Sequence, residues 1–258
     1  MISRFILPHS KSVFIGTSHA STFGSRLLSL WKGNELEPIP AFGGYKNEHV
    51  LDLHRQPASI RDKIAKAMVT MFKVPTDWFF GKRLAHRAVV IETVAAVPGL
   101  VGGLFVHLKS LRRIRHDHGW TNTLLQEAEN EKLHLMTFRE IAKPNIVDKL
   151  FIRAAQISFF GIYTMVYAIS PATAHRMIGY IEEEAIHSYS HFIREVEAGN
   201  IPNVPAPKIA IQYWNLDEKA KLKDLLFAIR DDEMEHRDVN HNFADQILNN
   251  PSSTPHGP

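Results

Sequence analysis

Two Glu-x-x-His motifs limit the folds open to this chain more than any other feature of its sequence. They are Glu131-x-x-His134 and Glu233-x-x-His236, and each lies in a long segment of helical periodicity. Residues three apart share one face of a helix, so each motif can present an oxygen and a nitrogen ligand to one metal ion. Two such motifs, with a carboxylate from each of two further helices, are the ligand set of a four-helix bundle that binds two metal ions.

The rest of the sequence is compatible with a helical bundle. Long segments with helical periodicity recur between about residue 59 and residue 248, and no run alternates apolar and polar residues in the manner of a strand. The breaks between these segments carry turn-forming residues such as proline. Ser170 and Asp217 are the expected N-caps of the last two helices. We therefore predict an all-α domain, with helices at about 59–72, 82–108, 120–142, 145–169, 172–198 and 217–247.

Several glutamates lie where a helix would otherwise be apolar. At about 100° per residue, Glu131 falls in a stripe of leucine, alanine and phenylalanine, and Glu233 falls in a second stripe of leucine, isoleucine and alanine. The segment Val89–Val106 is apolar apart from Glu92. An ionised glutamate in such surroundings needs a partner inside the core. We therefore expect these three glutamates to face the interior of the bundle.

A run of three glutamates supplies the fourth inward carboxylate. Only Glu182 borders the apolar stripe of its helix, whereas Glu183 and Glu184 point away from that stripe. Glu184 and His187 form a third Glu-x-x-His, which we interpret as a solvated pair. Ion pairs formed by chance at the surface are the alternative interpretation of the other two motifs, but the four inward carboxylates argue against it.

The chain contains no cysteine among its 258 residues. This absence excludes disulfides, thiolate metal sites and cysteine nucleophiles. Carboxylates combined with imidazoles, without thiolates, favour iron or manganese over softer metals. The formal net charge is +3, and no nucleic-acid-binding signature accompanies it. We therefore expect no nucleic-acid partner.

Composition divides the chain into four regions. Residues 1–33 contain no Asp or Glu, carry scattered Lys and Arg and are rich in serine, which is typical of a mitochondrial transit peptide. A disordered segment is the alternative interpretation. Residues 34–58 are expected to form an extended arm, residues 59–248 the helical-bundle domain, and residues 249–258 a flexible tail.

Two segments are apolar enough to interact with a membrane. Val89–Val106 contains one charged residue, and Phe151–Ile169 contains only Arg153. Each approaches the length that spans a bilayer, so two transmembrane helices are one interpretation. Helices that lie in the membrane surface are the other. Because Glu92 is assigned to the bundle interior, we predict an interfacial, monotopic membrane protein, with the basic cluster at 109–115 close to anionic headgroups.

Four ordered motifs resemble those of one family, the alternative oxidases. They are Ile91-Glu92-Thr93, Asn130–Leu135, Ile181–Ala185 and Arg230–His236. Connecting phrases are also similar, and the resemblance extends over about residues 46 to 246. These phrases are Val97-Pro98-Gly99, Ser110–Arg113, Val204–Pro207 and Tyr213-Trp214.

The departures from the family pattern are small. Family members usually have leucine where Ile91 and Ile181 stand, and Arg-Met where Lys132 and Leu133 stand. None of these differences removes a ligand. Because the chain has no cysteine, the thiol-based regulation of plant members cannot operate through cysteine here.

The resemblance implies roles for particular residues. Tyr189 would be the catalytic tyrosine, and Arg87 would bind the headgroup of the quinol. Asp232 and Asn130 would orient the ligand histidines through hydrogen bonds. The implied iron ligands are Glu92, Glu131, His134, Glu182, Glu233 and His236. The groups around them are Asn130, His175, Tyr213, Trp214 and Asp232, and the implied quinol site contains Arg87, Ile91, Glu92, Ile181, Ala185 and Ser188.

The resemblance also implies a function. Members of the family have six helices, built on a ferritin-like four-helix bundle. Their cofactor is a pair of iron ions bridged by carboxylates. Such an enzyme oxidises ubiquinol and reduces O2 to water in a cyanide-insensitive, non-electrogenic bypass of the cytochrome pathway. The implied location is the matrix side of the mitochondrial inner membrane, as a homodimer. A soluble di-iron hydroxylase or iron store, and a metal-free two-pass membrane protein, are the alternatives.

Overall fold

The computed structural model describes residues 54–257, so the predicted transit peptide and most of the predicted arm lie outside the described residues. Every regular element in this part of the chain is helical, as predicted. The elements are α3 (Ile60–Phe80), α4 (Leu84–Arg113), α5 (Trp120–Ala142), α6 (Ile146–Ile169), α7 (Pro171–Glu197), α8 (Lys208–Trp214), α9 (Leu222–Asn249) and the short 3-10 helix η1 (Pro251–Ser253).

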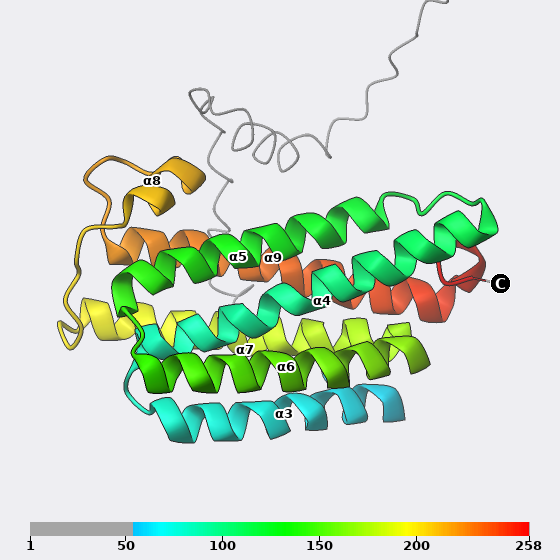
Figure 1. Cartoon of the computed structure of the whole chain (residues 1–258), viewed down its shortest axis with the longest axis horizontal. Coiled ribbons are helices and arrows are strands. Elements are labelled where there is room, and N and C mark those ends of the chain that lie inside the picture. The colour runs from blue at the N-terminus through cyan, green and yellow to red at the C-terminus, as the bar shows by residue number, and fades with distance from the viewer. Residues whose placement is uncertain (1–53, 258) are drawn as a thin grey trace, which may run out of the picture. The chain divides into compact units, whose positions relative to one another are not determined.

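Four of these helices form the bundle predicted from the two motifs. α4 packs along α5, α7 packs along α9, and α4 also contacts α7. α6 lies against α4 and α7, and α3 lies mainly against α7. In Figure 1, α5 and α9 form one side of this arrangement, α4 and α7 its middle, and α3 and α6 the opposite side. The predicted fold class is therefore confirmed, with α3 and α6 as a layer added to the bundle.

Local sequence signals explain where the later helices begin. Ser170 caps α7, as predicted, and Pro171 occupies the first helical position, where its missing N–H has no intrahelical partner to lose. The prediction that Asp217 caps the last helix is wrong, because α9 begins at Leu222. Asp217 instead accepts a hydrogen bond from the backbone N–H of Lys219 (2.8 Å) in the turn that precedes α9.

Two helices are longer than predicted. α3 continues through Pro75 to Phe80 instead of ending near residue 72, and α4 continues to Arg113. Aromatic packing holds the last turn of α3, since Phe79 stacks on Phe151 of α6 with ring centroids 4.4 Å apart and Phe80 is buried. That packing offsets the backbone hydrogen bond that proline removes. The seven-residue helix α8 was not predicted because so short a segment carries little periodicity.

A glycine brings α4 and α5 close together. A Cβ at Gly99 would lie 2.2 Å from the backbone oxygen of Leu124 and 3.0 Å from the Cβ of Ala128. A side chain at this position would therefore push the two helices apart. The close approach helps to hold Glu92 of α4 within reach of Glu131 of α5.

The two apolar helices differ in how much of their surface the protein covers. α4 and α6 are the two helices of the described residues that are long and apolar enough to cross a membrane. In α4, 67% of the most apolar stretch is buried, whereas in α6 only 17% is buried. α4 is therefore a core helix, and α6 directs most of its apolar surface outward.

The described end of the chain packs on the bundle. Composition predicts a flexible tail at residues 249–258, but residues 250–257 turn back through η1. Arg113 at the end of α4 donates a hydrogen bond to the carbonyl of Gly257 (2.6 Å). The Nε2 atom of His256 lies 3.1 Å from the hydroxyl of Tyr167 on α6. Two hydrogen bonds thus join this segment to α4 and α6.

Candidate metal centre and adjoining pocket

Buried ligands converge from four helices inside the bundle. One comes from α4, a Glu-x-x-His pair from α5, one from α7 and a second Glu-x-x-His pair from α9. They form two overlapping groups, in each of which the ligand atoms lie within 4.8 Å of one another, and Glu131 and Glu233 belong to both groups. The first group is Glu92, Glu131, His134 and Glu233, and the second is Glu131, Glu182, Glu233 and His236.

Several ligand atoms are buried without a hydrogen-bond donor or acceptor. Both carboxylate oxygens of Glu131 lack one, as do Oε2 of Glu182 and Oε2 of Glu233. Nδ1 of His236 lies 2.7 Å from Oε1 of Glu131, yet the two atoms do not meet in hydrogen-bond geometry. Unsatisfied buried polar atoms are costly, so donor atoms that converge in this way fit a bound cation. Carboxylates and imidazoles together suit iron or manganese.

Burial and mutual charge set the protonation of the cluster. Burial raises the pKa of Glu92 well above its ordinary range, and the charges of Glu131 and Glu233 raise it further. The pKa of Glu182 is raised for the same reasons. Burial would also raise the pKa of Glu131, but the two neighbouring histidines lower it below its ordinary value. A cation that binds among these groups therefore displaces protons from them.

Asp232 on α9 orients one of the ligand histidines. Its Oδ2 accepts hydrogen bonds from Nε2 of His134 (3.2 Å), Nε1 of Trp214 (2.8 Å) and Nδ2 of Asn130 (2.9 Å). Asn130 also donates to the hydroxyl of Tyr213 (3.0 Å). With its proton on Nε2, His134 presents the lone pair of Nδ1 to the cluster. Asn130 thus acts on His134 through Asp232 and not by the direct hydrogen bond expected from the resemblance.

His175 lies in a different network from the other expected neighbours of the cluster. Its Nδ1 is 3.0 Å from Oδ1 of Asn240, and its Nε2 is 3.1 Å from the hydroxyl of Tyr167. Asn240 in turn donates to both carboxylate oxygens of Glu127, at 2.9 and 3.0 Å. Burial raises the pKa of Glu127 to about 7. Sequence analysis missed Glu127 and Asn240, although each lies four residues from a ligand on the same helix face.

Tyr189 on α7 contacts the cluster directly. Its hydroxyl donates a hydrogen bond to Oε1 of Glu92, and its ring stacks on Phe138 with centroids 5.8 Å apart. Burial raises the pKa of the phenol well above its ordinary value, and the charge of Glu92 adds to this effect. The phenol therefore keeps its proton at neutral pH.

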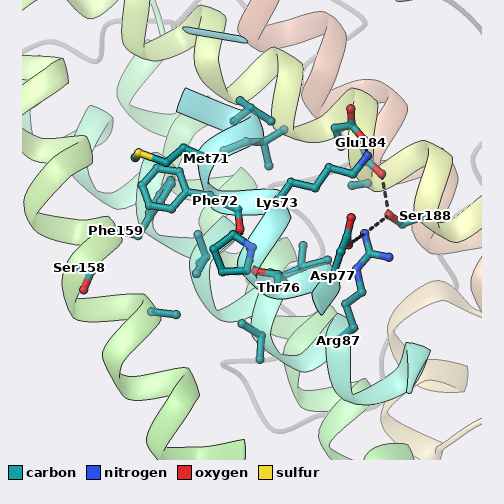
Figure 2. A pocket seen from close by; sticks show the side chains of 18 of the residues that line it. Met71, Phe72, Lys73, Thr76, Asp77, Arg87, Ser158, Phe159, Glu184 and Ser188 are labelled. Carbon is teal, nitrogen blue, oxygen red and sulfur yellow. Dashed lines mark hydrogen bonds and ion pairs between the residues drawn. The ribbon is translucent and has the colours of Figure 1, made fainter. Parts of the chain in front are cut away.

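A largely apolar cavity of about 380 Å³ adjoins the cluster, between α3, α4, α6 and α7 (Figure 2). Glu92, which the resemblance also assigned to the quinol site, does not line this cavity and is buried. On α4, residue 91 therefore faces the cavity and residue 92 faces the cluster. The other expected quinol-site residues do line it: Arg87, Ile91, Ile181, Ala185 and Ser188.

Charged side chains from α3, α4 and α7 meet at one wall of the cavity (Figure 2). Nη2 of Arg87 lies 2.9 Å from Oδ1 of Asp77 and donates to the hydroxyl of Ser188 (3.0 Å). Lys73 of α3 pairs with Glu184 of α7. Sequence analysis did not place Lys73 or Asp77 here, because the expected helix ended near residue 72 and both lie beyond it. Their spacing of four residues, which puts both on one face of a helix, is the signal that a longer α3 would have supplied.

A smaller cavity of about 20 Å³ connects this wall with Tyr189. A space of this size holds about one water molecule. Its lining shares Arg87, Ile91, Ala185 and Ser188 with the larger cavity and adds Tyr189. Tyr189 therefore lies between the cluster and the smaller cavity.

A comparison with protein families agrees with this geometry. The family model described as "Alternative oxidase" matches residues 45–245, which include all six converging ligands and the cavity. The chain belongs to the alternative oxidase family.

Curated relatives in the alternative oxidase family carry the name ubiquinol oxidase. The mitochondrial ubiquinol oxidase of Batrachochytrium dendrobatidis is 54% identical over 196 residues, which cover 76% of this chain and 62% of the relative. Ubiquinol oxidase 1c, mitochondrial, of Arabidopsis thaliana is 50% identical over 217 residues, covering 83% of this chain and 65% of the relative. The chain thus spans slightly less than two thirds of the length of these two relatives.

Two of the three consecutive glutamates of this alternative oxidase lie differently from the prediction. Glu183, expected to point away from the apolar stripe of α7, is nevertheless buried, and its Oε1 lies 3.0 Å from Nε2 of His241 on α9. Glu184, expected to pair with His187, pairs with Lys73, and His187 is exposed. The prediction assumed that this helix buries a single stripe. α7 is instead packed against α9, α6 and α3, so most of its circumference is buried.

Proposed function

We propose that this chain is a ubiquinol oxidase that reduces O2 to water at a di-iron centre. The observation that carries the proposal is the position of the apolar cavity beside the buried ligand cluster. Consecutive residues of α4 face the two sites, since Ile91 lines the cavity and Glu92 belongs to the cluster. A reductant bound in the cavity would therefore lie within short electron-transfer distance of the metals. The names of the curated relatives support ubiquinol as that reductant.

The ligand cluster is suited to two iron ions. Glu131 and Glu233 belong to both ligand groups, so each would help to hold both ions, while Glu92 with His134 and Glu182 with His236 would each complete one site. Oxygen-rich ligand sets of this kind stabilise oxidised iron. When bound, the iron pair supplies the capacity to accept electrons from the quinol and to pass them to O2.

The charged wall of the cavity would bind the quinol headgroup. Arg87 is permanently charged and has several donors, so it can donate to a quinol oxygen while it contacts Asp77 and Ser188. Oxidation of ubiquinol releases two protons and two electrons, and the reduction of one O2 to two waters consumes four of each. Two quinols and one O2 therefore balance without net proton uptake. This balance is consistent with a non-electrogenic enzyme.

Tyr189 is proposed to take part in the chemistry. Its phenol is protonated, buried and hydrogen bonded to Glu92, and it also lines the small cavity. From this position it can supply a proton and an electron while the O–O bond is broken. The hydrogen bond to Glu92 gives the proton a defined path to a ligand carboxylate.

Binding to a membrane surface is proposed for the layer formed by α3 and α6. Exposed apolar side chains are frequent on both helices, and they include Trp78 on α3 (85% exposed) and Ile169 on α6 (78% exposed). The cavity lies between these helices and the bundle, so the apolar tail of a quinol could enter it from lipid. We propose a monotopic protein on the matrix side of the mitochondrial inner membrane, in accordance with the mitochondrial names of the relatives.

A homodimer is proposed through α4 and α5, away from the membrane layer. Leucines at positions 100, 104, 108 and 111 form an exposed stripe along α4. Leu125, on the neighbouring helix α5, is also exposed. An exposed apolar stripe of this length, outside the proposed membrane layer, favours burial against a second copy of the chain.

The proposed function is tested with the full chain, loaded with iron and reconstituted in lipid vesicles with ubiquinol. We expect O2 uptake in the presence of cyanide, with two quinols oxidised for each O2 and no release of hydrogen peroxide. A matched Glu131→Ala protein should show neither bound iron nor O2 uptake. A protein that binds iron yet oxidises no ubiquinol would contradict the proposal and favour a soluble hydroxylase or iron store. A fully active metal-free protein would contradict the di-iron centre.

A further inference from the structure

A second tyrosine lies in the buried network that contains His175. Tyr167 of α6 is fully buried, and its hydroxyl has an imidazole on each of two sides. Nε2 of His175 is 3.1 Å from the phenol oxygen, and Nε2 of His256 from the folded end of the chain is also 3.1 Å away. A buried phenol between two ring nitrogens differs from an ordinary core tyrosine, which needs one hydrogen-bond partner.

The direction of each hydrogen bond follows from Asn240. Its Nδ2 faces acceptors only, namely both carboxylate oxygens of Glu127 and the backbone carbonyl of His236 (3.0 Å). Its Oδ1 therefore faces Nδ1 of His175, which must carry a proton to donate across the 3.0 Å contact. Nε2 of His175 is then left with a lone pair, which accepts the phenol proton of Tyr167. The phenol oxygen in turn accepts a hydrogen bond from Nε2 of His256.

Both imidazoles are neutral bases at physiological pH. Burial lowers the pKa of His175 to about 4 and that of His256 to about 3. A neutral imidazole can take up the proton that a phenol loses when it is oxidised, because a one-electron-oxidised phenol is a strong acid. Tyr167 therefore has a proton acceptor already in hydrogen-bond contact.

A short bonded path leads from Tyr167 to the metal cluster. It runs through the 3.1 Å contact to His175, the 3.0 Å contact to Asn240 and the 3.0 Å hydrogen bond from Asn240 to the backbone of the ligand His236. Electrons can tunnel along such a path. Protons cannot follow, because the amide of Asn240 does not relay them, so a proton released by Tyr167 stays on His175.

We propose that Tyr167 is a second redox-active tyrosine, which donates an electron to the metal centre when no quinol is available. In this step the phenol O–H bond breaks, one electron passes to the oxidised centre, and the proton forms an N–H bond at Nε2 of His175. Re-reduction reverses the step, with the electron supplied by the next quinol. The oxidant is the metal centre after its reaction with O2, so the role in turnover rests on the proposed function. The oxidised centre would then oxidise Tyr167 and not the side chains of its own ligands.

The second hydrogen bond to the phenol comes from His256, which lies outside residues 45–245, the part of the chain that the family model matches. Its hydrogen bond to the phenol oxygen would persist after oxidation and stabilise the neutral phenoxyl. The rings of Trp120 and Phe243, stacked with centroids 3.8 Å apart, close this end of the bundle around the two histidines. The phenol of Tyr167 is thereby buried, while His256 remains partly exposed.

To test this proposal, the iron-loaded protein is oxidised in two ways. A photo-oxidised ruthenium tris-bipyridine complex removes one electron without O2, and, in separate samples, the reduced protein is mixed with O2 in the absence of excess quinol. Freeze-quenched samples are examined by electron paramagnetic resonance. Because Tyr189 is also proposed to be redox-active, the variants are compared in a Tyr189→Phe background. We expect a tyrosyl signal in both samples of Tyr189→Phe, its loss when Tyr167→Phe is added, and its retention when Tyr180→Phe is added. Tyr180 is a matched control, because it is buried and its ring is 5.3 Å from that of His241, yet its hydroxyl has no hydrogen-bond partner.

Two further variants separate a redox role from a packing role. His175→Leu keeps the phenol but removes its proton acceptor, and it should abolish the Tyr167 signal without loss of iron. His256→Phe removes the donated hydrogen bond, and the radical should form with a larger g1 value. In the wild type, formation of the radical should be slower in D2O, since the proton moves with the electron.

The outcomes separate this inference from the proposed function. A radical that persists in the double variant Tyr167→Phe/Tyr189→Phe, or a Tyr189→Phe protein that yields none with the ruthenium oxidant, overturns the proposal. A radical at Tyr167 with the ruthenium oxidant but none with O2 supports a redox-active tyrosine and overturns its electron donation to the centre. A protein that forms the radical in both ways but oxidises no ubiquinol contradicts the proposed substrate and leaves Tyr167 as a redox-active residue.

Discussion

The phenol of Tyr189 on α7 donates a hydrogen bond to Oε1 of Glu92 on α4. Oε2 of the same carboxylate lies 3.2 Å from Nδ1 of His134, so Glu92 joins the tyrosine to the ligand cluster. The contact is made across the bundle, from α7 to a ligand on α4. This arrangement places the phenol one hydrogen bond from a metal ligand.

Tyr189→Phe should separate chemistry from packing. The substitution keeps the stacked ring and removes one buried hydrogen bond, so unfolding free energy should fall by only about 1 kcal/mol. If the phenol supplies a proton and an electron, ubiquinol oxidation should nearly cease while two irons stay bound. Both quantities are measured on one preparation, with Tyr180→Phe as the control. Activity close to wild type in Tyr189→Phe would reduce this residue to packing.

Ligands that belong to both ligand groups and ligands that belong to only one should differ in how many iron ions are lost when they are removed. Glu131 and Glu233 belong to both ligand groups, whereas Glu92 and Glu182 each belong to one. Glu131→Ala should therefore lose both irons, and Glu92→Ala should weaken one site more than the other. Iron is counted by mass spectrometry of the purified proteins. The control is Glu129→Ala, because Glu129 is a half-exposed residue of the same helix that pairs with Lys132 at 2.8 Å.

Equal iron loss in Glu92→Ala and Glu131→Ala would contradict the assignment of Glu131 to both sites. Iron retention in Glu131→Ala would contradict the site itself. The predicted direction follows from coordination, since removal of a carboxylate that would hold both ions leaves two incomplete sites.

Much of this site could be predicted because helical spacing and polarity carry the information locally. Glu131 and His134 are three residues apart, and their position within an apolar stripe already requires a buried partner. The same reasoning identified Glu233 with His236. No tertiary knowledge was needed, because a charged residue on the buried face of a helix is improbable unless something binds it.

The failures have a common physical cause, which is contact between segments distant in sequence. Glu183 is buried because α9 covers a second side of α7, and Lys73 reaches the cavity because packing extends α3 beyond Pro75. Neither fact is visible in the local pattern. The network of Glu127 and Asn240 was missed for the same reason, since a polar residue on a helix does not reveal which helix faces it.

Membrane binding should depend on the outward face of α6. Ile157 and Ile169 are both exposed apolar residues of this helix. Replacing both with aspartate should reduce binding to vesicles that contain anionic lipid by at least about tenfold, since each apolar side chain buried in lipid contributes about 1.5–3 kcal/mol. Flotation with the vesicles measures the bound fraction. Leu248→Asp on α9 is the control, and a double variant that floats as well as wild type would contradict the proposed membrane face.

Self-association should depend on the leucine stripe of α4. Leu104 is 56% exposed at the middle of this stripe. Leu104→Asp would bury an unpaired charge in a dimer interface, so it should shift the purified protein from dimer to monomer in sedimentation experiments in detergent. Val204→Asp, an exposed position before α8, should leave the mass unchanged. A Leu104→Asp protein that remains dimeric would exclude this face as the interface.

The stability of the folded chain should fall in mild acid because of His175. Burial lowers the pKa of this histidine from 6.5 to about 4. Below pH 6.5 the unfolded chain therefore binds a proton that the folded chain refuses, so the contribution to stability is complete above pH 6.5 and is lost as the pH falls towards 4. The loss amounts to about 3 kcal/mol over this window.

His175→Gln cannot titrate, so its unfolding free energy, measured by urea at a series of pH values, should fall less steeply than that of wild type. Release of iron in acid affects both proteins alike and cancels in the comparison, and His187→Gln, at an exposed position of the same helix, should follow wild type. Parallel curves for wild type and His175→Gln between pH 6.5 and 4 would show that His175 is not held in its neutral form.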